Sequence, residues 1–500
     1  MSKRTPLVNS FTRVWVIDGG ARVDRDPEFL YFMKMDTVEK NFGSVNPIYE
    51  PSKIQYNEFD ETASFRDEEE RPTSSLIGRY PQSVKSRILE LAQKKCQVDV
   101  QLHIGACTSP GVFNDFMKVL IFEDVAFETY STDSLGSIEP GERGAINETV
   151  EVSARKMYEY VPIEYAARAP ASVTNELVAA SLCDMPACGD CGTISNGCQK
   201  ILAVSKAAGG SAGTPADIVF SVDGGANFFA EDIDTLGVAV DPADVACVGD
   251  YAVVVASTDG DQMHIVDKDD LDGVIDPAFT QVTTGFVANA APTCIDAIAN
   301  IAYLGALNGY IYKTSDPAGG VTVVDAGEAT TSTINDIDMY TEDFQVAVGN
   351  DGVVLMIEND IASAIANQPV GIGTNLNVVL VMSESEWLVG ADDGNIYYTT
   401  NQGVAWTTKA LVPVATSVTD IKASTSSVIY VAATVSGKGE IFVSIDGGNS
   451  FVRTPRSAAN AMPANDQINA LVPCPFDVDF VAGFGLADDA TDGFIVIGSD

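Results

Sequence analysis

A chain of 500 residues is too long for one ordinary domain, and 46% hydrophobic against 20% charged residues provides enough apolar material for sizeable cores. The formal net charge of −41 disfavours binding to nucleic-acid phosphates, which depends on clustered Lys and Arg. The sequence has neither an apolar run of the roughly 20 residues that a membrane span needs nor the apolar core of a secretory signal, so we expect a soluble chain made in the cytoplasm.

The negative charge is concentrated in the C-terminal two thirds of the chain. Residues 1–170 hold 20 Lys and Arg against 27 Asp and Glu, whereas residues 171–500 hold 9 against 43. Such acidity is typical of high solubility or of adaptation to a salty medium. An acidic surface also repels DNA, which suits a channel through which DNA must slide.

Residues 1–170 are predicted to form one β-rich domain that contains a single helix. The helix is expected at 83–95, where Val84, Ile88 and Leu91 share one face behind the N-cap candidate Ser83. Strands are expected where apolar residues alternate or cluster, at 14–18, 29–35, 54–59, 96–104, 116–130 and 149–165.

A cysteine cluster marks residues 171–200, which are predicted to connect two domains. Four cysteines fall close together, namely Cys183, Cys188, Cys191 and Cys198. They fit either an all-cysteine zinc site, although the spacing is tighter than in a usual zinc ribbon, or two disulfides. Both alternatives staple a loop and imply no catalysis. The other five lie in apolar contexts and are interpreted as buried free thiols: Cys96, Cys107, Cys247, Cys294 and Cys474.

The sequence repeats from about residue 200 to the C-terminus. The segments 221–228 and 444–451 both fit the motif S-x-D-x-G-x-x-F, and 399–406 is a degenerate copy. The motif residues are Ser221, Asp223, Gly225 and Phe228, then Thr399, Asn401, Gly403 and Trp406, and finally Ser444, Asp446, Gly448 and Phe451. Weaker copies align at Asp269, Asp316, Asn359 and Asp500.

These seven anchors are 42 to 54 residues apart, which is the length of one four-stranded propeller blade. Seven anchors predict seven blades, and six or eight stay open because the first and last units each look one strand short. The motif fits a tight turn between the outer two strands of a blade: the carboxylate accepts backbone N–H groups, the glycine supplies a positive φ, and the aromatic residue covers the hairpin. We therefore interpret the motif as structural and distant from any central site.

The motif resembles the Asp-box or BNR-repeat propellers, which include sialidases, sortilin-like receptors and photosystem assembly factors. A sialidase holds its substrate carboxylate with three arginines, and residues 201–500 contain only Arg453 and Arg456. His103 and His264 are the only histidines, which disfavours a Ser/His/Asp or Cys/His arrangement. We therefore expect that the chain is not an enzyme.

Two acidic runs are weak calcium candidates. The run at 267–273 resembles a calcium loop, but its carboxylates miss the required spacing and no bidentate Glu follows. Asp488, Asp489 and Asp492 form a second, weaker candidate. No cofactor is expected with certainty, and zinc at the cysteine cluster is the main alternative.

The segments 113–125 (FNDFMKVLIFEDV), 130–136 (YSTDSLG) and 147–152 (NETVEV) resemble the tail tube proteins of long-tailed bacteriophages, a resemblance that covers residues 10–170. It implies a β-sandwich or barrel that assembles into stacked rings, hexameric or trimeric with two such domains each. DNA would pass through the lumen without specific binding, and the loops 36–75 and 131–148 would bridge neighbouring rings. A generic β-sandwich is the alternative for this domain.

The sequence thus predicts a mainly β protein with a tail-tube-like domain at 1–170, a cysteine-rich connector at 171–200 and an Asp-box propeller at 201–500. Its predicted function is that of a structural virion protein of the phage tail. It would be made in the host cytoplasm, self-assemble, contact other tail proteins and carry the propeller as external decoration. The alternative is a non-enzymatic propeller that binds a protein or a surface glycan.

Overall fold

The computed structural model describes eight strands within residues 13–160, and most of residues 165–498. The gaps in the second range are 169–174, 184–197, 199, 207–215, 234–240, 259–261, 274–276, 455–465, 476–479 and 487–492. The chain forms two compact units, Met1–Pro162 and Ile163–Asp500. The described part is almost entirely β, with short 3-10 turns. Within it, no helix has the length and hydrophobicity needed to cross a membrane.

The first unit contains one sheet of eight strands in the order β2-β1-β5-β6-β7-β4-β3, with β8 also paired to β6. The strands are β1 (Arg13–Asp18), β2 (Pro27–Leu30), β3 (Met35–Glu39), β4 (Thr73–Pro81), β5 (Val98–Ile104), β6 (Lys118–Thr132), β7 (Ala145–Ser153) and β8 (Lys156–Tyr160). The first half of β6 lies between β5 and β8, and its second half pairs with β7. This central position explains why Val119 to Phe122 is a continuous apolar run, since all four residues are buried.

Most of the strands expected in this unit are present. β1, β5 and β6 correspond to the segments 14–18, 96–104 and 116–130, whereas 29–35 contains the end of β2 and the start of β3. The segment 149–165 is divided among β7, β8 and the following strand. β4 was missed because its sequence, TSSLIGRYP, shows no apolar alternation. The expected strand at 54–59 and helix at 83–95 lie outside the described residues.

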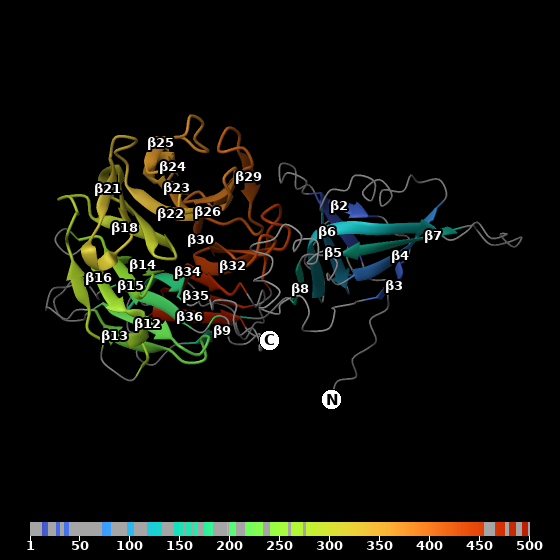
Figure 1. The fold of residues 1–500 in the computed structure, drawn as a ribbon, viewed down its shortest axis with the longest axis horizontal. Helices are drawn as coiled ribbons and strands as arrows, with labels where there is room; N and C mark the ends of the chain where they lie inside the picture. The colour runs from blue at the N-terminus through green and yellow to red at the C-terminus, as the bar shows by residue number, and fades with distance from the viewer. Residues whose placement is uncertain are drawn as a thin grey trace, which may run out of the picture. The chain divides into compact units, whose positions relative to one another are not determined.

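The second unit is a seven-bladed β-propeller made of seven four-stranded antiparallel sheets (Figure 1). Blades 1 to 3 contain β10 (Leu177–Leu182), β11 (Ile201–Ser205), β12 (Asp217–Ser221) and β13 (Phe229–Asp232); β14 (Pro242–Val248), β15 (Tyr251–Ala256), β16 (Met263–Asp267) and β17 (Thr280–Val282); and β18 (Pro292–Ile298), β19 (Ile301–Ala306), β20 (Tyr310–Thr314) and β21 (Thr322–Ala326).

Blades 4 to 6 follow the same order. They contain β22 (Ile334–Thr341), β23 (Phe344–Gly349), β24 (Val354–Glu358) and β25 (Ile361–Ala364); β26 (Leu376–Ser383), β27 (Glu386–Ala391), β28 (Asn395–Thr399) and β29 (Thr407–Ala410); and β30 (Ser417–Ala423), β31 (Ile429–Val435), β32 (Lys438–Ser444) and β33 (Val452–Arg453). The first strands of successive blades contact one another, and β34 of the last blade contacts β10 of the first, so these seven inner strands form a closed ring.

The seventh blade is built from both ends of the unit. It contains β34 (Gln467–Pro473), β35 (Val481–Leu486) and β36 (Gly493–Gly498), and its outermost strand is β9 (Tyr165–Arg168), which pairs with β36. The prediction of seven blades is therefore confirmed. The first repeat only appeared to lack a strand, because its innermost strand, β10, lies within the cysteine-rich segment. The last repeat is completed by β9.

This closure corrects the expected domain boundaries. Residues 171–200 do not form a separate connector, because β10 is the innermost strand of blade 1. The propeller unit begins with β9, within the range assigned to the first domain. The physical reason is that a closed ring must pair its two ends, and the strand that does so at the N-terminal side precedes the first complete blade.

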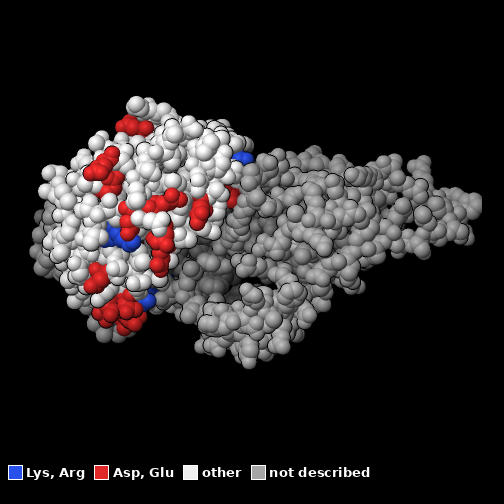
Figure 2. Space-filling view, turned by 45° about the horizontal axis from the view of Figure 1, so that its top comes forward, with Lys and Arg blue, Asp and Glu red and all other residues white. Residues whose placement is uncertain are grey.

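The surface of the propeller is acidic, as the charge balance of residues 171–500 requires. The described face in Figure 2 shows clusters of Asp and Glu and few Lys or Arg side chains. Such a surface repels polyanions and attracts positively charged partners.

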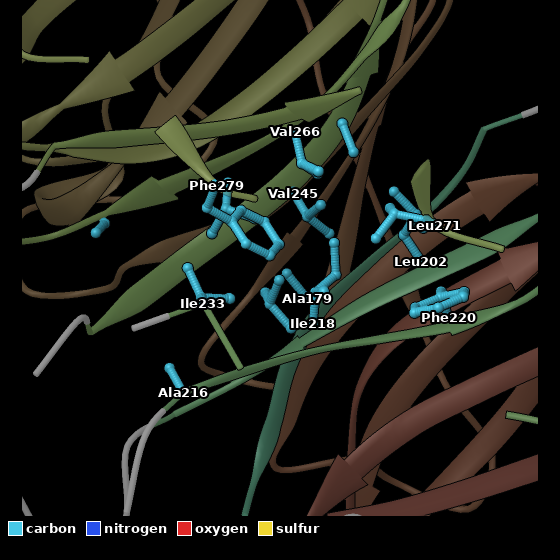
Figure 3. Packing of buried hydrophobic residues seen from close by; sticks show 14 residues of the cluster. Ala179, Leu202, Ala216, Ile218, Phe220, Ile233, Val245, Val266, Leu271 and Phe279 are labelled. Atoms are coloured by element: carbon cyan, nitrogen blue, oxygen red, sulfur yellow. The ribbon is translucent and has the colours of Figure 1, made fainter. Parts of the chain in front are cut away.

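The propeller core lies between neighbouring blades. Figure 3 shows Leu202 and Ile218 of blade 1 with Val245 and Val266 of blade 2 in one buried cluster. Strands covered on both faces read as continuous apolar runs, as in β11, where all five residues are buried. Each fully buried aliphatic side chain contributes about 1.5–3 kcal/mol to folding, so the blade interfaces hold the ring together.

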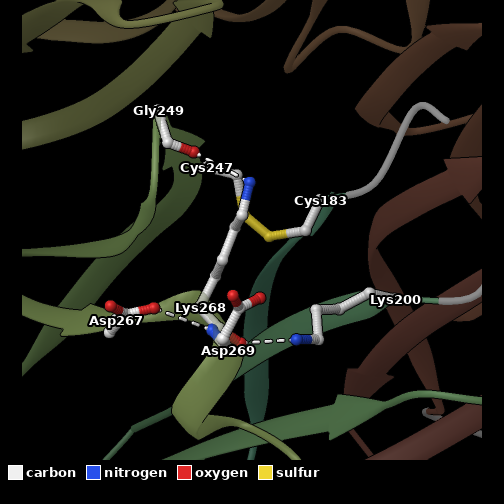
Figure 4. Close-up of a disulfide and its surroundings, with 7 residues drawn as sticks. All are labelled: Cys183, Lys200, Cys247, Gly249, Asp267, Lys268 and Asp269. Atoms are coloured by element: carbon white, nitrogen blue, oxygen red, sulfur yellow. Dashed lines mark hydrogen bonds between the residues drawn. A yellow bond between two sulfur atoms is a disulfide. The ribbon is translucent and has the colours of Figure 1, made fainter. Parts of the chain in front are cut away.

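Two disulfides connect blade 1 to the blades on either side of it. Cys183 follows β10 and is bonded to Cys247 of β14 in blade 2 (Figure 4). Cys198 of blade 1 is bonded to Cys474, which follows β34 in blade 7. Beside the first disulfide, the Lys200 ammonium donates to the carbonyl of Lys268.

This pairing corrects two expectations. Cys247 and Cys474 are not free thiols, whereas Cys294 is free and buried as expected. Cys183 and Cys198 are bonded to cysteines of other blades, so the four clustered cysteines do not act together as zinc-binding thiolates. The reason is topological: the ring brings distant segments next to the cluster. Cys96, Cys107, Cys188 and Cys191 lie outside the described residues.

Candidate functional site: the axis and one face of the propeller

The motif residues of blade 1 form a tight turn between β12 and β13. The Ser221 hydroxyl donates to Asp223 Oδ1 (2.9 Å) and accepts the N–H of Gly225 (2.8 Å). Asp223 Oδ1 also accepts the N–H of Asn227 (2.8 Å). The segments 399–405 and 444–450 repeat the same three bonds in blades 5 and 6.

The motif glycines contact the preceding blade. Gly225 has φ +85° and Gly448 has φ +88°, a conformation that side chains disfavour. A Cβ on Gly448 would lie 2.8 Å from Leu388 of blade 5, and one on Gly225 would lie 3.0 Å from Ile497 of blade 7. The motif therefore fixes a turn and packs it against the preceding blade.

The motif aromatics reach beyond their own hairpins. Phe228 of blade 1 packs edge-on against Phe484 of blade 7, with ring centroids 6.0 Å apart. Trp406 donates its Nε1–H to the carbonyl of Asn367 (2.8 Å) in the connection between blades 4 and 5. Phe451 packs on the core between blades 5 and 6.

Substituting Asp446 by Ala tests how much this turn contributes. Asp446 is 1% exposed, and its carboxylate bonds the Ser444 hydroxyl and both the N–H and the hydroxyl of Ser450. Because the substitution orphans these buried donors, we expect the free energy of unfolding to fall by about 2–3 kcal/mol in denaturant titrations. The matched change Asp223→Ala, at the more exposed turn of blade 1, should cost only about 1 kcal/mol. Equal losses at the two turns would contradict this reasoning.

The remaining sequence candidates do not converge. Asp269, Asp316 and Asn359 lie in the turns between the outer strands of blades 2, 3 and 4, as the repeat predicts, and Asp500 is outside the described residues. His264 is buried in β16, and His103 lies in β5 of the other unit.

The acidic run at 267–273 forms a 3-10 turn in which Asp267 accepts the N–H of Asp269. Among the described residues, no three His, Cys, Asp or Glu side chains are grouped as a metal site would need. Asp488, Asp489 and Asp492 are outside that part of the chain.

The inner strands share a distortion that the sequence did not reveal. Each of the seven has a register shift next to its start, before Ala179, Asp244, Cys294, Asp336, Val378, Asp420 and Ala470 respectively. In five blades the polar residue at the shift donates to a carbonyl of the next inner strand. These residues are Thr293, Asn335, Asn377, Thr419 and Asn469.

Five carboxylates add a second set of bridges around the axis. Each accepts a backbone N–H from the inner strand of the next blade, at 2.5–2.9 Å. These axial carboxylates are Asp244, Asp296, Asp336, Asp338 and Asp420. They replace the backbone ladder that is missing between blades and hold the inner ring together.

One cation, the Lys422 ammonium, interacts electrostatically with all five axial carboxylates. Burial raises the pKa of each of them, to about 7 for Asp244 and, with repulsion from Asp296, to about 7 for Asp338. Burial disfavours the charged form of Lys422, but attraction from the axial carboxylates raises its pKa above the ordinary value. A single ammonium among five carboxyl groups therefore favours partial protonation of the cluster near neutral pH.

The connections between blades and the turns between second and third strands lie at the same end of the propeller. In blade 5, Leu376 at the start of β26 pairs with Ala391, and Ala410 at the end of β29 pairs with Asn395. The turn 392–394 therefore lies beside the residues where the chain enters and leaves the blade. We call this end the connection face. The motif turns lie at the opposite end, as strand direction dictates.

Three aliphatic side chains stand out from the connection face. Ile372 is 92% exposed in the connection between blades 4 and 5, and Val412 and Val414 are 74% and 77% exposed in the connection between blades 5 and 6. Neighbouring exposed aliphatic residues are typical of surfaces that bind a partner. The sequence did not reveal this surface, because short apolar stretches in loops resemble strand ends.

No protein-family model and no curated protein matches the sequence. Among solved structures, YCF48 bound to D1 peptide is similar, with a TM-score of 0.50 at 15% identity over 68% of this chain and 98% of that chain. YCF48 from Cyanidioschyzon merolae has a TM-score of 0.48 at 12% identity, over 67% of this chain and 98% of that chain. The WD40 propeller domain of Doa1 has a TM-score of 0.47 at 11% identity, over 68% of this chain and 97% of that chain. At these identities the likeness shows the propeller fold alone.

Proposed function

We propose that this chain is a non-enzymatic binding protein whose propeller recognises another protein through its connection face. The observation that carries the proposal is the exposure of Ile372, Val412 and Val414, which lie in two successive connections on the same face of the propeller. The structurally similar YCF48 binds a D1 peptide, which supports this choice over a surface glycan.

The chemistry of the axis supports a binding role more than catalysis. The axial carboxylates each use an oxygen to bond the neighbouring blade, so they act as structural bridges. Within the described residues no histidine lies among them and no metal-binding group is formed. The proposed binding role requires no cofactor.

The experiment is to probe arrays of synthetic peptides and of glycans with the labelled full-length protein. We expect saturable binding to a subset of peptides that is weakened by serine at Ile372, Val412 and Val414. Binding to neither array, or peptide binding that ignores these substitutions, would sink the proposal. Binding to glycans alone would replace the partner protein by the surface glycan.

The tail tube role of residues 1–170 stays a prediction. The first unit has a long antiparallel pairing of β6 with β7 and β8, which any large β-sheet can contain. Electron microscopy of the purified protein tests the prediction: rings or tubes with a regular repeat would support it. A monomer that also fails to grow on a tail-tip nucleus would remove it, and with it the virion location and the stacked-ring partners.

A further inference from the structure

The proposed function leaves the chemistry of the partner open, and the surface itself indicates it. We propose that the connection face of blades 4 and 5 binds a basic peptide segment of another protein, with aliphatic side chains between its Lys or Arg residues. This inference rests on the proposed function and narrows it to one class of partner.

The two valine anchors are held on a fixed stretch of backbone. Val412 and Val414 lie between Leu411 and Ala415, which are 1% and 2% exposed, so the chain is fixed on both sides of the exposed pair. Ile372 lies between two glycines, and a Cβ on either of them would meet nothing within 4 Å. The three side chains are therefore open to a partner, and ordering the two valines costs little because the backbone around them is already held.

The two connections are joined by the turn 392–394 of blade 5. The N–H of Asp392 donates to the carbonyl of Asn375 (3.0 Å), three residues from Ile372. On the other side, a Cβ on Gly394 would lie 2.1 Å from the carbonyl oxygen of Ala415, one residue from Val414. The exposed aliphatic residues thus flank one acidic turn and form a single surface.

This surface carries negative charge and no positive charge. The five segments that make it up in blades 4 and 5 are 327–333, 350–353, 365–375, 392–394 and 411–416. They contain Glu328, Asp351, Asp392 and Asp393 and neither Lys nor Arg, and all four acidic side chains are exposed. Aliphatic residues on both sides of an acidic turn complement a peptide whose basic residues fall between apolar ones.

The turn is built to stay ionised. Burial opposes ionisation of Asp393, but its carboxylate accepts the Tyr397 hydroxyl (2.5 Å) and the Asn395 N–H (2.9 Å), and together these bonds lower its pKa. The charge is therefore present throughout the neutral range. Nucleic acid and anionic lipid would be repelled by the same carboxylates.

The test uses the full-length protein and a fluorescein-labelled peptide of alternating arginine and leucine pairs, followed by fluorescence anisotropy. We expect saturable binding that weakens as salt is raised, because part of the attraction is between exposed charges. Replacing Ile372, Val412 and Val414 together by Ser should weaken binding at least about tenfold, because serine removes the apolar side chains that the peptide would bury. Asp392→Lys should weaken it at low salt and much less at high salt.

The matched control replaces Ile361 by Ser. Ile361 is 70% exposed but begins β25 at the opposite end of blade 4, so binding should not change. A second control peptide carries glutamate in place of arginine and should not bind. Equal loss in the control variant would overturn the assignment of the surface.

The outcomes separate this inference from the proposed function. If the protein binds neutral or acidic array peptides through the same three residues and ignores the basic peptide, the inference fails and the proposed function stands. If no peptide binds in either format, both fail. If the triple variant instead abolishes self-association in a sizing experiment, the face binds a second copy of this chain and the inference is overturned.

Discussion

Replacing Cys198 and Cys474 together by Ser should lower the free energy of unfolding by about 5 kcal/mol, the largest loss we expect from any change in the propeller. The disulfide joins residues 276 positions apart and links the first blade to the last. Its removal restores conformational freedom to the unfolded chain over almost the whole ring. Because domains are stable by only about 5–15 kcal/mol, a propeller opened at this point should be close to unfolding.

The second disulfide gives the matched comparison. Cys183 and Cys247 are 64 positions apart, so replacing this pair should cost about 4 kcal/mol by the same chain-entropy relation. Cys294→Ala is the control for the loss of a buried sulfur outside any disulfide. Denaturant titrations measure all three. If the free energy of unfolding does not change when Cys198 and Cys474 are replaced, the pairing of β9 and the blade interfaces are sufficient to close the ring without the disulfide.

Asp244→Asn should make the propeller more stable at pH 8 and leave its stability unchanged at pH 4. Burial raises the pKa of Asp244 to about 7, so the folded state holds the proton more tightly than the unfolded state. This contribution is complete below pH 3.8 and is lost as the pH rises through about 7. The asparagine oxygen can still accept the N–H of Ile295 and carries no charge, but the bond from the Val245 N–H to Asp244 Oδ1 is lost.

We expect a gain of about 1–3 kcal/mol at pH 8, after allowance for the solvent that reaches this partly exposed side chain. Urea titrations across the pH range measure it. Asp343→Asn, at an exposed turn of blade 4, is the matched control for the loss of one carboxylate. A variant as pH-dependent as the parent chain between pH 4 and 7 would show that Asp244 titrates normally.

The sequence predicted the propeller because its repeated residues bond one another within a single turn. Ser444, Asp446 and Gly448 close a turn within a few residues, so their spacing survives in every recognisable copy. The blade count followed from the period of the repeat. The strands of the first unit were predicted where apolar residues alternate or cluster, and β4 was missed because it has neither pattern.

The axis and the connection face could not be predicted in this way. Asp244 and Asp336 become equivalent only when β-bulges align the inner strands of different blades. In a chain with 70 Asp and Glu residues, no local pattern distinguishes them from surface carboxylates. Likewise, Val412 and Val414 are exposed only because Leu411 and Ala415 occupy the buried positions of that connection. The disulfide partners were hidden for the same reason, since ring closure sets them.

The pairing of β9 with β36 also sets the order in which the molecule can be made. A ribosome produces β9 before any blade and β36 after nearly all of the others, so the seventh sheet cannot form until translation of the propeller is almost finished. Until then β9 has no strand to pair with, and the inner strand β10 lacks its contact with β34. The growing chain therefore carries unsatisfied strand edges that invite pairing with other nascent chains. Slow synthesis or crowded ribosomes should favour aggregation of this protein more than that of a protein whose blades close one at a time.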